Sequence, residues 1–229
     1  MASELVVNGQ AVPLTFKRNA RAKNIILKMD PKNGGAIVTL PSYARESEGL
    51  RFARSKIDRI AKRLAVLPQA VPFAAGTIVP LLGVDHMIRH RSDARGTAWI
   101  EEGEIHVAGK PEFLARRTAD FLKKTAREEI VPRAEAYARQ VERKLGRITL
   151  RDTRSRWGSC AANGNLSFSW RLVLAPVEVL DYVVAHEVAH LVHHNHSPAY
   201  WAVVRELVPE ADGLRRWLKT NGPRLHLYG

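Results

Sequence analysis

The chain has 229 residues, of which 45% are hydrophobic and 26% charged, and this composition excludes a largely disordered protein. Lys and Arg outnumber Asp and Glu by 36 to 23, so the net charge of +13 favours negatively charged partners without choosing among nucleic acid, acidic proteins and anionic surfaces. The first residues show no basic segment followed by an apolar run, no stretch reaches the roughly 18 apolar residues that a membrane helix needs, and Cys160 is the single cysteine of the sequence. We therefore expect a cytoplasmic protein that does not associate with membranes.

The first 110 residues have the pattern of short strands interrupted by one amphipathic helix. Turn residues fill 30–35, and the apolar residues of 46–67 recur with the period of a helix that Pro68 ends. Strands are predicted at 12–16, 24–29 and 36–40, and again within 77–108.

The remaining residues predict mostly helices with a small sheet. The predicted helices are 111–145, 176–193, one beginning at Ser197-Pro198 and a short one around 214–218, and the predicted strands are 148–150 and 165–170. No internal repeat is evident. We therefore predict an α+β fold with a boundary near residue 110, which separates a β-rich N-terminal region, 1–110, from a mostly helical catalytic domain, 111–229.

The sequence His-Glu-Val-Ala-His at 186–190 lies within a predicted apolar helix. His186 and His190 are one helical turn apart on one face, so both imidazoles can bind one zinc ion at about 2.0–2.1 Å. Glu187 follows the first histidine and is placed to take a proton from zinc-activated water. The motif predicts one catalytic Zn²⁺ per chain, with Glu187 as the general base.

A third ligand is needed, because a catalytic zinc usually has three protein ligands and one open position. His193 lies about 10 Å further along the helix axis, too far to share the ion. If Asn195 ends the helix in the left-handed conformation, His196 swings back towards the metal. Glu206, on the next helix, and the thiol of Cys160 remain alternative third ligands.

Several segments of the second half resemble the YgjP-like family of metal-dependent hydrolases, which is related to the SprT and WLM metalloproteases. The similarity is specific from about residue 147 to 205 and extends more loosely over the N-terminal strands. Val188 and Tyr200 depart mildly from the residues usual in the family. The segments that carry the resemblance are 154–160, 165–176, 182–191, 195–197 and Trp201.

The resemblance implies a zincin-like metallopeptidase domain in which His186, His190 and His196 bind zinc and Glu187 is the general base. The implied substrate is a polypeptide. Some SprT-like enzymes act on proteins attached to DNA, so a DNA-associated protease is an alternative, with nucleic acid bound by the basic surface. A second alternative is a nucleic-acid-binding module in which the zinc is structural.

Four further residues are candidates for substrate binding: Arg154, Arg156, Trp157 and Tyr200. The first three precede the strand pair that leads into the metal-binding helix. Tyr200, His193 and Arg156 are also candidates to stabilise a transition-state oxyanion. The alternative is that Trp157 packs in the core and that both arginines are solvated. The sequence gives no indication of the oligomeric state.

Overall fold

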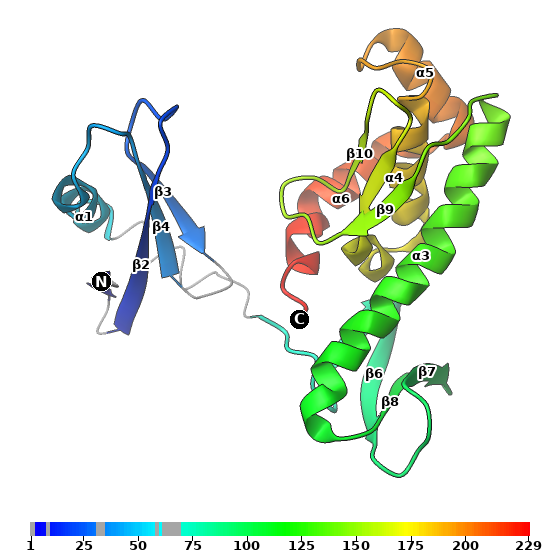
Figure 1. Cartoon of the computed structure of the whole chain (residues 1–229), viewed down its shortest axis with the longest axis horizontal. Coiled ribbons are helices and arrows are strands. Elements are labelled where there is room, and N and C mark those ends of the chain that lie inside the picture. Colours follow the sequence, from blue (N-terminus) through cyan, green and yellow to red (C-terminus); the bar gives the residue numbers. More distant parts are fainter. Residues whose placement is uncertain (1–2, 8–9, 31–34, 58–59, 61–69) are drawn as a thin grey trace. The chain divides into compact units, whose positions relative to one another are not determined.

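A computed structural model describes residues 3–7, 10–30, 35–57, 60 and 70–229. The chain forms two compact units, Met1–Ala70 and Val71–Gly229, each with its own hydrophobic core (Figure 1). The position near residue 110, where we expected the boundary, falls inside the second unit. Strand β8 (Glu104–Ala108) and helix α3 (Leu114–Gln140) lie on either side of it and contact each other, because both bury apolar residues in one core.

The first unit is a four-stranded sheet with one described helix, α1 (Glu46–Arg54), packed on β4. A Cβ on Gly49 would lie 2.7 Å from Leu40 Cδ2, so the glycine lets the helix approach the sheet closely. The helix predicted over 46–67 begins as expected, but α1 ends at Arg54 with Ser55 as its C-cap. Residues 58–59 and 61–67 of the predicted helix lie outside the described residues. The strands, in the order β1-β2-β4-β3, are β1 (Ser3–Val7), β2 (Gln10–Arg18), β3 (Ile26–Asp30) and β4 (Gly35–Leu40).

The second unit begins with a sheet of the same topology. In both sheets a central parallel pair is flanked by antiparallel strands, and the order is first-second-fourth-third. The sequence showed no repeat because such short strands share only their alternation of apolar and polar residues. The strands are β5 (Ile78–Leu81), β6 (Val84–Arg91), β7 (Ala98–Glu101) and β8.

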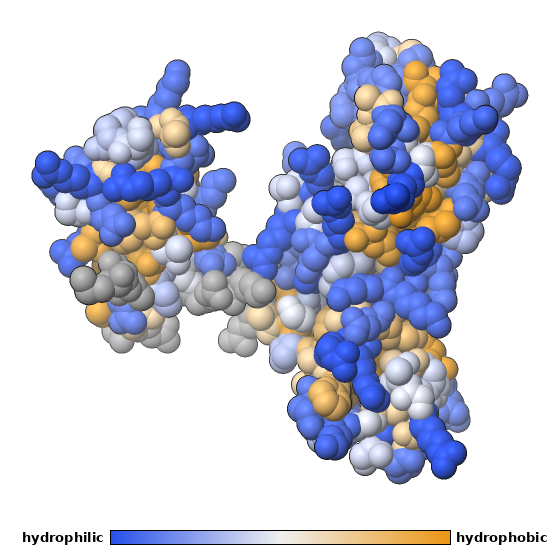
Figure 2. Space-filling view, viewed as in Figure 1, coloured by the Kyte–Doolittle hydropathy of each residue, from blue (hydrophilic) through white to orange (hydrophobic). Residues whose placement is uncertain are grey.

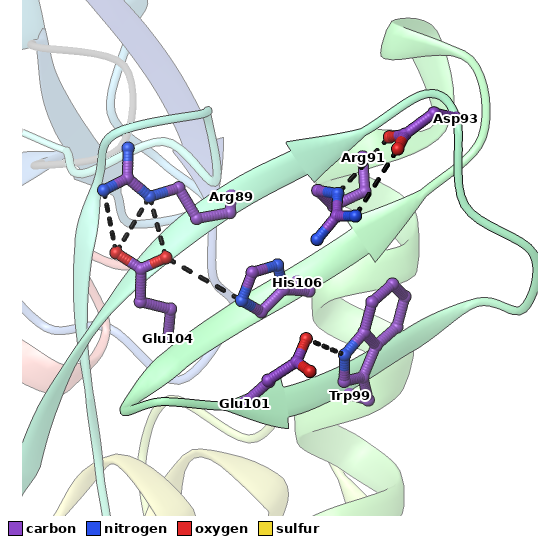
Figure 3. A network of polar contacts seen from close by, with 7 residues as sticks. All are labelled: Arg89, Arg91, Asp93, Trp99, Glu101, Glu104 and His106. Carbon is purple, nitrogen blue, oxygen red and sulfur yellow. Dashed lines mark hydrogen bonds and ion pairs between the residues drawn. The ribbon is translucent and has the colours of Figure 1, made fainter.

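Polar side chains cover the face of this second sheet that points away from the core (Figure 3). The Arg89 guanidinium lies 2.8 Å from the Glu104 carboxylate, and Arg91 Nε lies 3.3 Å from Asp93 Oδ1. The rings of Trp99 and His106 stack with their centroids 5.4 Å apart. On this face, therefore, both arginines of β6 are neutralised by carboxylates.

Helix α3 connects this sheet to the rest of the second unit (Figure 1). Its 27 residues span roughly 40 Å. It packs on β7 and β8 and also on the 3₁₀ helix η2 (Trp170–Leu174) and helix α4 (Val177–Ala189). The helix ends at Gln140, before the predicted end at 145, and Glu142 takes a positive φ of 54° just beyond it.

A small three-stranded sheet precedes α4 in the chain. β11 (Leu166–Ser169) is central, parallel to β9 (Ile148–Arg151) and antiparallel to the edge strand β10 (Gly158–Cys160). The strands predicted at 148–150 and 165–170 are confirmed, whereas β10 was missed because it has only three residues and begins with glycine. Helices α5 (Pro198–Leu207) and α6 (Ala211–Leu225) complete the α+β fold.

The visible face of each unit is mainly hydrophilic, with smaller apolar areas between the polar side chains (Figure 2). Among the helices of the described residues, none combines the length and the apolar character needed to cross a bilayer.

Candidate metal centre

Helix α4 carries the His-Glu-Val-Ala-His sequence through the hydrophobic core. Nine of its 13 residues are buried, which fixes the orientation of the helix against α3, α5 and α6. The helix ends at Ala189, earlier than the predicted end near 193. His190 nevertheless keeps helical angles, φ −67° and ψ −16°, as the C-terminal cap. It therefore remains one turn from His186, and their ring centroids are 5.4 Å apart.

The chain reverses direction between α4 and α5. The expectation that Asn195 ends the helix in a left-handed conformation was wrong: among the described residues only Leu82, Glu102 and Glu142 are non-glycine residues with positive φ. The turn is instead closed by side chains, since Asn195 Oδ1 accepts a hydrogen bond from Ser197 N at 3.3 Å. Ser197 then caps α5, its Oγ accepting from Tyr200 N.

This reversal brings His196 back to the end of α4. One ligand atom each from His186, His190 and His196 lie within 4.8 Å of one another, and the Nε2 atoms of His186 and His196 are 3.5 Å apart. Two nitrogens bound tetrahedrally to zinc at about 2.0–2.1 Å would be about 3.4 Å apart. We call these three residues the histidine triad. The alternative ligands Glu206 and Cys160 are described residues but do not belong to the group.

The imidazoles of His186 and His190 each have a lone pair available to bind a metal ion. Burial lowers the pKa of His186 to about 4, with smaller contributions from His190 and His196, so this ring is neutral at pH 7. Burial also lowers the pKa of His190. Its Nδ1 faces the carbonyl oxygen of His193 at 3.0 Å and must therefore donate a proton, which leaves Nε2 unprotonated. Nδ1 of His186 is buried without a hydrogen-bond partner among the described residues.

Glu187 lies beside the triad and is only 5% exposed. Burial raises the pKa of its carboxyl to about 7, and the positive charge of Arg156 partly opposes this shift. The carboxyl and all three triad residues line one open cavity of about 560 Å³. A group poised between its charged and neutral forms near pH 7 is suited to transfer protons.

Gly158, a residue that the sequence analysis did not single out, makes room for this carboxylate. A Cβ at Gly158 would lie 2.5 Å from both Cγ and Oε1 of Glu187, closer than real Cβ contacts. The edge strand β10 therefore passes directly beside the acid. A glycine inside a strand is a known signal of such close approach, and it could have drawn attention to this position.

The four predicted substrate-binding residues are not gathered in one place. Arg156 is exposed and lines the cavity with Glu187. Tyr200 is fully buried beneath the triad, where its hydroxyl donates to the backbone oxygen of His186 at 2.9 Å and its ring stacks on His190. Trp157 packs against Gly222 and stacks on His226, away from the cavity. Arg154 is exposed and does not line the cavity.

Comparison with known proteins gives two findings. The sequence model of the family described as "YgjP-like, metallopeptidase domain" matches residues 23–221. Among solved structures, the chain is similar to the metallopeptidase zymogen abylysin of Pyrococcus abyssi, with 18% sequence identity and a TM-score of 0.36, over 40% of this chain and 93% of that one. No functionally curated protein matches the sequence.

Proposed function

Since the chain belongs to the YgjP-like metallopeptidase family, we propose that it is a zinc-dependent peptidase that hydrolyses peptide bonds with Glu187 as the general base. The observation that carries the proposal is the juxtaposition of a three-histidine cluster with a buried carboxylate in one open cavity. Three imidazoles suit a divalent zinc ion and leave one coordination position for water or substrate.

The residues of this chain have distinct parts in the proposed reaction. Zinc, when bound by the triad, supplies a Lewis acid that polarises the peptide carbonyl and makes a water molecule more acidic. Glu187 takes a proton from the attacking water and delivers it to the leaving nitrogen. Tyr200 holds the backbone of His186, and the His193 carbonyl orients the His190 ring. Arg156 lines the cavity, and its positively charged side chain can bind substrate there.

Two features favour this function over a nucleic-acid-binding module with structural zinc. A structural zinc site normally has four protein ligands, whereas the group found among the described residues has three. A structural site also has no use for a buried carboxylate with a pKa of about 7 beside the ligands.

Removing the metal tests the proposal directly. We expect the purified full-length protein to contain about one zinc per chain and to cleave unfolded polypeptides, such as casein, at pH 7. Dialysis against a chelator should abolish cleavage, and added Zn²⁺ should restore it, because only the metal-loaded triad can activate the substrate carbonyl. Cleavage that persists in metal-free protein, measured by metal analysis of the same sample, would contradict the proposal.

Gly158→Ala is expected to lower kcat/KM by about 100-fold. The added methyl group would overlap the Glu187 side chain and displace its carboxylate from the position needed for proton transfer. Zinc content should not change, since the three atoms nearest to a Cβ at Gly158 all belong to Glu187 and none belongs to the triad. Gly213→Ala on α6 is the matched control, because a Cβ there meets only Arg216 Nη2, at 3.9 Å. Equal kinetics for both variants would show that the position of this carboxylate is unimportant.

A further inference from the structure

A second cavity of about 590 Å³ adjoins the catalytic one. It lies on one face of the small sheet formed by β9, β10 and β11, and we call it the arginine groove. Along each strand, the side chains of this face alternate with side chains that point to the opposite face. Ser155, Arg156 and Ser159 line both cavities, so the two cavities adjoin each other at these residues. An extended chain bound in one can therefore reach the other past these residues.

The arginine groove is lined by positive charges and by no carboxylate. Arg147, Arg151 and Arg156 line it, and no lining residue is acidic. None of the three arginines forms an ion pair with a carboxylate in the described part of the chain, in contrast to Arg89 and Arg91 on the other sheet (Figure 3). The remaining lining residues include five with hydroxyl groups: Thr149, Thr153, Ser155, Ser159 and Ser167.

The acidic residue next to the groove in sequence is already engaged. Asp152 accepts two hydrogen bonds from Arg171, at 2.6 and 3.1 Å, and Arg171 lowers the pKa of this carboxyl. Arg171 is itself buried and is therefore a fixed partner. Asp152 thus stays charged and bound to Arg171, and the three groove arginines remain available to an external anion.

From this arrangement we infer that the arginine groove binds acidic side chains of the substrate polypeptide, on one side of the bond to be cleaved. This inference rests on the proposed peptidase function and adds a substrate class to it. Guanidinium groups form paired hydrogen bonds with carboxylates. Thr149 and Thr153 already donate to backbone oxygens, but the hydroxyl groups of Ser155, Ser159 and Ser167 can donate further hydrogen bonds to the same carboxylate. The protein is then a peptidase that prefers acidic segments.

Nucleic acid is the other anionic polymer that a basic groove could bind. Grooves for single strands combine positive charge with aromatic side chains on which bases stack. The residues that line the arginine groove include no aromatic side chain. The position of the groove next to the catalytic cavity also favours the polymer that is cleaved there.

Binding to an inactive variant tests this inference without any turnover. The probe is a labelled 12-residue peptide rich in Asp and Glu, compared with its Asn and Gln counterpart, on zinc-loaded full-length Glu187→Gln protein by fluorescence anisotropy. We expect the acidic peptide to bind about fivefold more tightly at low salt and to lose this advantage at high salt, because exposed ion pairs are screened. Equal binding of the two peptides would overturn the inference.

Substitution of the groove arginines locates the binding site. When Arg147→Gln and Arg151→Gln are both added to the Glu187→Gln protein, the preference for the acidic peptide should disappear. Arg127→Gln with Arg139→Gln, two exposed arginines of α3 outside the groove, changes the net charge equally and should preserve it. Loss of the preference in both pairs would also overturn the inference, because net charge alone would then explain it.

Two further measurements separate this inference from its alternatives. A single-stranded oligonucleotide that binds more tightly than the acidic peptide, and whose binding depends on Arg147 and Arg151, would assign the groove to nucleic acid and refute our inference.

The second measurement is the cleavage specificity of the wild-type protein on a mixture of peptides from digested cell protein. Asp and Glu should be enriched on one side of the cleaved bonds. Cleavage without that enrichment refutes the groove's role alone, whereas an inactive wild type that still binds the acidic peptide refutes the proposed catalysis alone.

Discussion

Glu187→Gln is expected to lower kcat for peptide hydrolysis by roughly 10²–10⁴-fold while the zinc content stays near one per chain. Glutamine has almost the same size and fits the same space beside Gly158, so the fold and the triad should be preserved. Its neutral amide does not accept a proton from water at pH 7. The measurement is kcat on a peptide substrate together with metal analysis of the same preparation.

The control for this substitution is Glu206→Gln. Glu206 is exposed, lies on α5, and is absent from the group of residues that could hold a metal. Its substitution should leave both activity and zinc content unchanged, which would also remove it as an alternative third ligand. A Glu187→Gln protein with full activity would show that another group acts as the base, and our mechanism would fail.

His196→Ala is expected to leave the purified protein almost free of zinc and inactive. Losing one of three protein ligands should weaken binding by more than the about 10–100-fold that follows loss of a hydrogen bond to a metal ligand. His196 is exposed and follows the end of α4, so its replacement should leave the core and the fold unchanged. Metal analysis and zinc titration against a chelating dye provide the readout, and circular dichroism checks the fold.

His194→Ala is the matched control for the metal-binding prediction. His194 is also exposed and lines the same cavity, but it is not one of the three residues whose ligand atoms converge. Zinc content should therefore stay near one per chain. If the His194 variant lost zinc and the His196 variant kept it, the chain reversal after α4 would deliver a different ligand from the one proposed here.

The pairing of His186 with His190 could be predicted from helical periodicity alone. His186 and His190 lie on one helical turn, so their proximity follows from 3.6 residues per turn wherever the helix packs. The strong apolar pattern of 177–189 predicted a buried helix, and α4 is buried on most sides. For the same reason His193 was recognisable as too distant along the axis. Geometry within one element depends only on short-range sequence.

The division into compact units and the short edge strand could not be predicted in this way. β10 has three residues and no periodicity to detect, and it is held by its pairing with β11. The strands within 77–108 looked like a continuation of the N-terminal strands, yet their apolar residues belong to the same core as those of α3, while the first sheet has a core of its own. Which core a strand joins depends on long-range packing that local composition does not encode.

By itself the sequence determined the α+β class, the turn of α4 that holds His186 and His190, and the carboxylate of Glu187 beside them, since each depends on short-range sequence patterns. The sequence left His196, Glu206 and Cys160 as possible third ligands, and the tertiary structure brings His196 to that turn. Tertiary structure alone decided that Gly158 gives Glu187 its space, and that three arginines without an ion-pair partner form a groove next to the cavity. These contacts join residues from different elements. Their distances are set by how helices and strands pack together, and burial then sets the pKa of Glu187 near 7.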